Sequence, residues 1–170
     1  YNRFINQPQE LAILNRGVIA DGQNIYLSHD HPAIVYRFPA RNDDSRTMIA
    51  AMLSEKGELY STGYVHGIQH ADETTTEGRF ALLGYLNSLT CDWWIRRIND
   101  RHITAPIVNR LPIPKWDEHS VQAVSTLVAE LLWRRGTAMI PGLIPVPRFP
   151  QNKNLSDFEL IAQIEHMVLA

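Results

Sequence analysis

The sequence predicts an α+β fold: a small antiparallel sheet, then one long packed helix, then spacer helices toward the C-terminus. Three observations support this prediction. Short apolar runs bounded by turn residues recur about every 10 residues before position 70. A long run with helical spacing follows them, and two later runs of the same spacing lie behind helix caps. Hydrophobic residues make up 45% of the 170 and charged residues 20%, as in an ordinary globular domain.

The sheet is expected from four strand-like runs, at 24–28, 33–38, 47–53 and 59–68. Turn and loop residues separate these runs, namely His31-Pro32, Pro39, Asn42-Asp43-Asp44 and Lys56-Gly57. In the last run, Tyr60, Tyr64 and His66 occupy alternate positions, so a continuous strand would place them on one face.

The long helix is predicted over about 77–98, where apolar side chains recur at three- and four-residue spacing. A short strand is expected at 103–108, followed by the stiff extended segment Leu111-Pro112-Ile113-Pro114. Two more helices are predicted, at 118–135 behind the cap Asp117 and from Ser156 to the C-terminus. The second begins with a capping box made by Ser156 and Glu159.

Membrane and disulfide-based classes are disfavoured. No apolar run approaches the ~20 residues that span a bilayer, and the N-terminus lacks the order of a signal peptide. Cys91 is the only cysteine, so an intrachain disulfide is impossible and a cytoplasmic location is expected. Because the chain starts at Tyr1 without an initiator Met, we expect it to be a piece of a longer polypeptide.

Cys91 and the Trp93-Trp94 pair lie within the long apolar helix and are predicted to pack in the core. The alternatives are a nucleophilic cysteine and a pair of base-stacking tryptophans.

Charge is unevenly distributed along the chain. Residues 79–115 hold six basic and two acidic side chains, a net +4, on a chain whose net charge is -2. Such a band is suited to a phosphate backbone, although a solvated helix face explains it equally well.

Catalytic motifs are absent from the sequence. It has no glycine-rich methyl-donor loop, no Asn/Asp-Pro-Pro-Tyr loop, no phosphate-binding loop and no Gly-x-Ser-x-Gly elbow. His29-Asp30-His31 and the set His66, His70 and Asp72 have the residue types of metal ligands. A strand would hold His66 and His70 ~13 Å apart, so polar loop residues are favoured. We therefore predict no catalytic residue and no metal site in this chain.

Candidate DNA contacts occur in two places. The end of the long helix carries Arg96, Arg97, Asn99 and Arg101. Arginine suits phosphate and guanine, and asparagine suits adenine, because each makes paired hydrogen bonds. The loop before the helix carries the other candidates, Thr75, Thr76 and Arg79. Helix capping with salt bridges is the alternative for the first group, and a solvated connection for the second.

An ordered set of motifs resembles the TaqI-like C-terminal specificity domain of N6-adenine DNA methyltransferases and fused restriction-modification enzymes. The motifs are Arg46-Thr47-Met48-Ile49-Ala50-Ala51, Gly63-Tyr64-Val65, Leu82-Leu83-Gly84-Tyr85-Leu86-Asn87-Ser88 and Asn109-Arg110-Leu111-Pro112-Ile113-Pro114. The resemblance runs from about residue 46 to residue 132, roughly half the chain. We accordingly divide the chain into a target recognition domain at 1–115, a spacer helix at 116–136, and a Pro-rich arm with a last helix at 137–170.

The resemblance implies sequence-specific binding of double-stranded DNA in a phage-defence system. It also implies a partner, the N-terminal methyltransferase domain of the parent protein, which uses S-adenosylmethionine and receives a flipped adenine. On this interpretation the chain itself holds no cofactor, and the parent is an adenine-specific DNA methyltransferase, with or without a fused endonuclease. Two alternatives remain open. One is a protein-interaction module that uses the apolar stripes of the two trailing helices, and the other is a metal-dependent hydrolase that uses the histidines.

Overall fold

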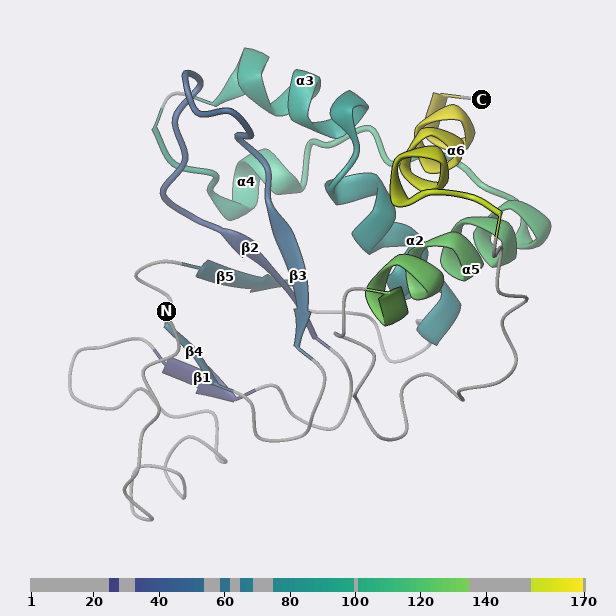
Figure 1. The fold of residues 1–170 in the computed structure, drawn as a ribbon. Coiled ribbons are helices and arrows are strands. Elements are labelled where there is room, and N and C mark those ends of the chain that lie inside the picture. The colour runs from purple at the N-terminus through teal and green to yellow at the C-terminus, as the bar shows by residue number, and fades with distance from the viewer. Residues whose placement is uncertain are drawn as a thin grey trace.

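The computed structural model describes residues 25–27, 33–53, 59–61, 65–68, 75–99, 101–134 and 154–169. These residues form five strands and five helices, so the α+β class is confirmed (Figure 1). The strands are β1 (Ile25–Leu27), β2 (Ala33–Arg37), β3 (Ala50–Leu53), β4 (Leu59–Ser61) and β5 (Val65–Ile68). The helices are α2 (Thr76–Leu86), α3 (Leu89–Ile98), α4 (Ala105–Val108), α5 (Glu118–Arg134) and α6 (Asp157–Leu169).

The described strands form two antiparallel sheets. β2 is the centre of a three-stranded sheet, where Val35 lies opposite Ala51 of β3 and Gly67 of β5. β1 and β4 form a separate pair. The run predicted as one strand at 59–68 is therefore divided between two sheets, which removes the basis for placing Tyr60 and His66 on one face; Tyr64 lies outside the described residues.

The segment predicted to begin β3 bonds to helix α3 through its first two residues. The backbone N–H groups of Thr47 and Met48 donate to the carboxylate of Asp92 on α3, at 2.8 and 2.7 Å. The strand consequently begins at Ala50, later than the predicted 47.

The single long helix predicted at 77–98 is wrong, because the chain breaks between α2 and α3 at Asn87 and Ser88. Ser88 starts the second helix as its N-cap, where its Oγ accepts from the N–H of Cys91 at 3.0 Å. Asn87 is drawn out of the helix by two hydrogen bonds of its amide to the backbone of Ala50.

The strand predicted at 103–108 is also wrong, since this segment forms the short helix α4. Pro106 lies in its first turn, where the missing N–H of proline costs nothing. The two trailing helices are confirmed. Asp117 Oδ1 accepts from the N–H of Ser120, and Ser156 and Glu159 cap each other reciprocally.

One hydrophobic core joins the three-stranded sheet to α2, α3, α5 and α6. It includes Ile34 of β2, Leu83 of α2, Ile95 of α3, Val128 of α5 and Ile164 of α6, all of them buried. Most apolar side chains of α5 and α6 therefore face inward, whereas Trp133, Phe158, Ile161 and Leu169 are exposed. None of the helices in the described ranges combines the length and apolar character needed to cross a bilayer.

Gly84 sits where α2 meets α5 within this core. A Cβ atom at this position would lie 2.7 Å from a methyl group of Val128 and 3.3 Å from one of Val124. The absence of a side chain therefore permits the close approach of the two helices.

Cys91 is fully buried, in agreement with the predicted core position. Burial is the largest influence on its thiol and raises the pKa to about 12, which keeps the sulfur protonated and unreactive.

Candidate nucleic-acid interface

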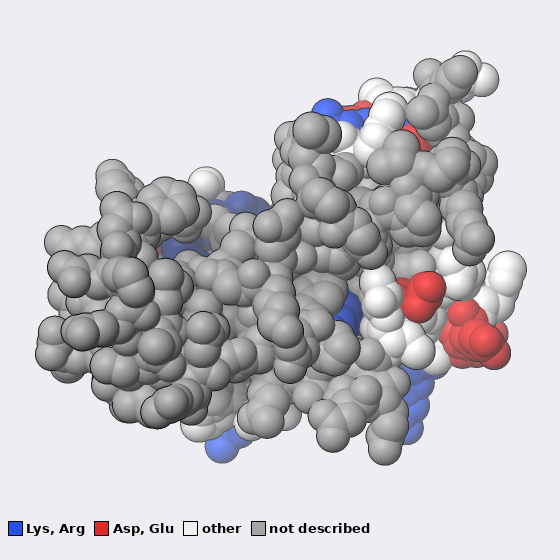
Figure 2. Space-filling view, turned by 90° about the horizontal axis from the view of Figure 1, so that it is seen from below, with Lys and Arg blue, Asp and Glu red and all other residues white. Residues whose placement is uncertain are grey.

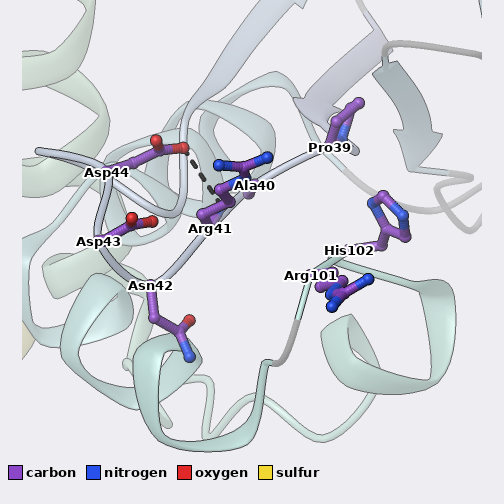
Figure 3. A pocket seen from close by; sticks show the side chains of 8 residues that line it. All are labelled: Pro39, Ala40, Arg41, Asn42, Asp43, Asp44, Arg101 and His102. Atoms are coloured by element: carbon purple, nitrogen blue, oxygen red, sulfur yellow. Dashed lines mark hydrogen bonds between the residues drawn. The ribbon is translucent and has the colours of Figure 1, made fainter.

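A groove of about 850 Å³ lies between the loop that follows β2 and the segment that joins α3 to α4 (Figure 3). Residues 39–44 line one side, and Arg101 and His102 line the other. The two segments are hydrogen-bonded to each other: the N–H of Ala40 donates to the carbonyl of Arg101 at 3.2 Å, and the N–H of Ile103 donates to that of Phe38 at 3.0 Å. Backbone hydrogen bonds thus join the two segments that line the groove.

The loop itself is closed by Asp44. Its carboxylate accepts from the backbone N–H of Arg41 at 3.2 Å, as Figure 3 shows, and from the guanidinium of Arg37 at 2.8 Å. The hydroxyl of Thr47 donates to the carbonyl of Arg41 at 3.1 Å. These bonds fix the turn that presents Arg41, Asn42 and Asp43 to solvent.

Asp92 anchors the loop to the inner side of α3. Its buried carboxylate accepts from the N–H groups of Thr47 and Met48 and from Nε of Arg96 at 2.8 Å, and Arg46 Nε lies 3.9 Å away. Burial alone would raise the pKa of this carboxyl. The hydrogen bonds from Arg96 and Met48 and the charges of Arg46 and Arg96 outweigh it, so the pKa lies below its ordinary value.

Two of the motifs quoted for the resemblance, at 46–51 and 82–88, meet beside this anchor. The guanidinium of Arg46 donates to the carbonyls of Asn87 and Ser88 at 2.5 and 3.2 Å. The amide of Asn87 bonds to both backbone groups of Ala50. Two motifs separated by about forty residues in the sequence therefore hold each other in place.

Arg96, a predicted DNA contact, is occupied within the protein. Besides its bond to Asp92, it donates to the carbonyls of Asn42, Asp44 and Ser45 at 2.5, 2.7 and 3.0 Å. Its guanidinium holds the loop against α3 and has little remaining hydrogen-bonding capacity for a phosphate or a base. This role is close to the salt-bridge alternative considered from the sequence.

Asn99 and Arg79 are buried, with 5% and 4% of their surfaces exposed. The side-chain amide of Asn99 donates to the backbone carbonyl of Ala40 at 3.1 Å, and the backbone carbonyl of Asn99 accepts from the side-chain amide of Asn42 at 2.6 Å. Asn99 therefore holds the groove loop and is not available to an adenine. Arg79 lies in α2 and does not line the groove.

Thr75 and Thr76 are exposed at the start of α2, outside the groove. The hydroxyl of Thr75 accepts from the N–H of Gly78 at 3.1 Å, which is the N-cap bond of the helix. The two threonines do not line the groove with Arg101.

Three exposed arginines differ from Arg96: Arg41, Arg97 and Arg101. Within the described residues, none of their guanidinium groups makes a hydrogen bond or an ion pair with another side chain or carbonyl. Arg41 and Arg101 face the groove from its two sides. The sequence did not single out Arg41; its position in a turn directly after a strand is the signal that could have identified it.

Phe38 and two histidines form an aromatic stack beside the groove. The ring of Phe38 stacks on His66 with a centroid distance of 4.1 Å and on His102 with one of 4.8 Å. His66 is therefore part of a ring stack, and the residues that the structure describes contain no cluster of potential metal ligands. His29, His31, His70 and Asp72 lie outside the described residues.

Trp93 and Trp94 are 51% and 40% exposed, so the prediction that this pair packs in the core is wrong. The helical repeat explains the difference. Cys91, Asp92 and Ile95 turn toward the core, which directs 93 and 94 away from it. The two indoles meet edge to face at 5.7 Å, and the guanidinium of Arg97 lies 3.9 Å from the ring centre of Trp93.

The surface drawn in Figure 2 shows the visible Lys and Arg atoms of the described residues in separate places between grey atoms. That face shows no continuous basic surface among the described residues. The candidate interface therefore consists of the groove and α3.

Comparison with protein-family models, with curated proteins and with solved structures found no match for this chain.

Proposed function

We propose that this chain is a sequence-specific recognition module for duplex DNA, which presents a target adenine to the separate catalytic domain of a methyltransferase or restriction-modification enzyme. The observation that carries the proposal is the groove with Arg41 on one side and Arg101 on the other. Both guanidinium groups are exposed and have no partner among the described residues, while the loop behind them is held by Arg96, Asn99 and Asp92.

The groove combines the side chains that DNA recognition requires. Arg41 and Arg101 suit phosphate oxygens or the O6 and N7 atoms of guanine. Asp43 would repel a phosphate but accepts from the amino group of cytosine, so its presence favours contact with base edges. Because the loop is ordered before binding, less conformational entropy is lost when DNA enters.

The resemblance of the motifs supports the same proposal. Their residues form the scaffold, as the contacts of Arg46 with Asn87 and Ser88 illustrate. The groove residues are carried by this scaffold on a loop, where recognition side chains usually lie. In this proposal the methyl donor, S-adenosylmethionine, belongs to the N-terminal domain of the parent, and the module works in the cytoplasm.

The test is selection from a pool of random duplexes by the full chain at ~50 mM salt, followed by sequencing of the retained fraction. We expect one short motif to be enriched. The double variant Arg41→Ala/Arg101→Ala is expected to lose the enrichment, while Lys115→Ala, which removes an exposed cation outside the groove, retains it. Absence of any retained DNA, or an unchanged motif in the double variant, would overturn the proposal.

A protein-interaction module is the second candidate. The predicted version used α5 and α6, where Leu127 and Leu160 are buried in the core but Trp133, Phe158 and Ile161 are exposed. A second surface favours the same candidate: α3 exposes Leu89, Trp93, Trp94 and Ile98. Sedimentation velocity of the chain, alone and with its parent's catalytic domain, distinguishes this candidate, since it predicts a complex that Trp93→Ala/Trp94→Ala abolishes.

A further inference from the structure

One side of α3 is apolar and faces away from the core. The outer face of α3 is made of Leu89, Trp93, Trp94, Arg97 and Ile98, all of which are exposed. At 100° per residue these positions cover about half of the helix circumference. A contiguous apolar surface of this kind on a charged molecule marks a binding site more often than a random exposure.

The outer face lies next to the groove. Arg96, the neighbour of Arg97 in the sequence, reaches the carbonyls of Asn42, Asp44 and Ser45, so the groove loop runs along this edge of α3. Arg101, which follows the helix, lines the groove itself. A nucleic acid seated in the groove would therefore pass beside the two tryptophans.

The charge of the outer face restricts its occupant. Among its own residues the one ionised group is Arg97, and Arg101 lies beyond its C-terminal end. At its other end the carboxylate of Glu165 on α6 accepts from the N–H of Leu89. The single acid of α3, Asp92, is buried on the opposite side and bonded to Arg96. The surface thus offers two flat aromatic rings, with the positive charge of Arg97 on the ring of Trp93 and the acid at the opposite end of the helix. A nucleobase with its flanking phosphates complements this combination.

We propose that the outer face of α3 is a second nucleic-acid contact, where an unpaired nucleobase stacks in the corner formed by Trp93 and Trp94. Arg97 and Arg101 face the phosphates that flank that base. The base must be unpaired, because a base inside a duplex has both faces covered by its neighbours. Extrusion of a base for chemistry creates unpaired positions of this kind. The inference rests on the proposed recognition of duplex DNA.

The probe is a labelled duplex with one unpaired adenine as a single-base bulge, compared with the same duplex fully paired, at one fixed salt concentration. Fluorescence anisotropy with the full chain gives both affinities. We expect the bulged duplex to bind about tenfold more tightly, because stacking of one base on an aromatic ring is worth that much. Replacing the bulged adenine by fluorescent 2-aminopurine is expected to show quenching on binding.

Three variants test the assignment. Trp93→Ala/Trp94→Ala should remove the tenfold preference and leave the affinity for the paired duplex unchanged. Trp93→Phe/Trp94→Phe, which retains aromatic faces, should restore most of the preference. Trp133→Ala removes a tryptophan that is 41% exposed on α5 and should leave both affinities as in the wild type.

The outcomes separate this inference from the proposed function. Binding of the paired duplex without a preference for the bulge overturns the stacking site and leaves DNA recognition standing. A preference that survives in Trp93→Ala/Trp94→Ala also overturns it. Absence of binding to either duplex overturns both. Self-association that disappears in this double variant, without any change in DNA affinity, would identify the outer face as a protein surface and contradict the inference.

Discussion

The two sides of α3 place similar side chains in opposite environments. Arg96 and Arg97 are adjacent in the sequence, yet Arg96 donates to Asp92 and to three loop carbonyls, whereas Arg97 lies in the open on the ring of Trp93. The inner side builds the groove by holding its loop, and the outer side is left available to a ligand. The comparison teaches that adjacent arginines in a sequence can be either bonded within the fold or exposed, and that only their partners distinguish the two.

The largest effect is expected on the inner side. Asp92→Ala removes the acceptor of two backbone N–H groups and leaves Arg96 without its carboxylate. Each buried backbone N–H that is left without its acceptor costs about 1–3 kcal/mol of unfolding free energy. Urea denaturation followed by circular dichroism measures the loss. Asp92→Asn, which keeps an acceptor oxygen, is the control and should lose less unfolding free energy. Equal stability of Asp92→Ala and the wild type would show that Asp92 does not stabilise the fold.

Acid should weaken the same anchor. The pKa of Asp92 is lower in the folded chain than in the unfolded chain, so its contribution to stability is complete above the unfolded value of about 3.9 and is lost as the pH falls through the folded value. The gap in unfolding free energy between wild type and Asp92→Asn should be constant from about pH 7 to pH 5 and shrink below about pH 4. A gap that widens on acidification would reverse the assigned direction of the shift.

A smaller effect is expected at the break between the two helices. Ser88→Ala removes the N-cap of α3, whose hydroxyl accepts from the N–H of Cys91 at 3.0 Å. Loss of an N-cap costs about 0.5–2 kcal/mol. Thermal unfolding measures it, and Ser88→Thr, which retains the hydroxyl for both Cys91 and Tyr85, serves as the control. If Ser88→Ala unfolds like the wild type, the cap does not explain where α3 begins.

The outer side should contribute least to stability. Arg97→Ala removes the contact with the ring of Trp93 and no hydrogen bond or ion pair within the described residues. An exposed cation–π contact is worth about 0.5–1 kcal/mol, so the midpoint of urea denaturation should hardly move. A loss of unfolding free energy as large as that of Asp92→Ala would show that Arg97 also stabilises the fold. The two sides of α3 would then not differ in this respect.

Sequence periodicity was sufficient for the elements whose pattern is local. The helices α5 and α6 and their caps at Asp117 and Ser156 follow from spacing and from hydrogen bonds within one turn. The break at Ser88 was missed, although a serine N-cap could have suggested it, because apolar spacing continues through it. The late start of β3 depends on Asp92, more than forty residues away, and no local pattern contains that information.

The candidate site was predicted only in part. Arg97 and Arg101 are exposed as expected, whereas Asn99 and Arg79 are buried and Arg96 is bonded to the loop. Residue type indicates which bonds a side chain can make but not which partners the fold supplies. Arg41 was missed for the same reason, since its place opposite Arg101 depends on the pairing of segments far apart in the sequence.

The most direct test of the contrast between bonded and free arginines is the salt dependence of DNA affinity. Anisotropy across a salt series should give a linear fall of log affinity with log salt for the wild type, and each phosphate contact contributes about 0.9 to the slope. Arg41→Ala/Arg101→Ala should reduce the slope by up to about 2 units if both arginines contact phosphates, with unchanged urea denaturation, while Lys115→Ala leaves it intact. Affinity that does not depend on salt, or an unchanged slope and unchanged affinity in the double variant, would contradict the assignment of these arginines to DNA.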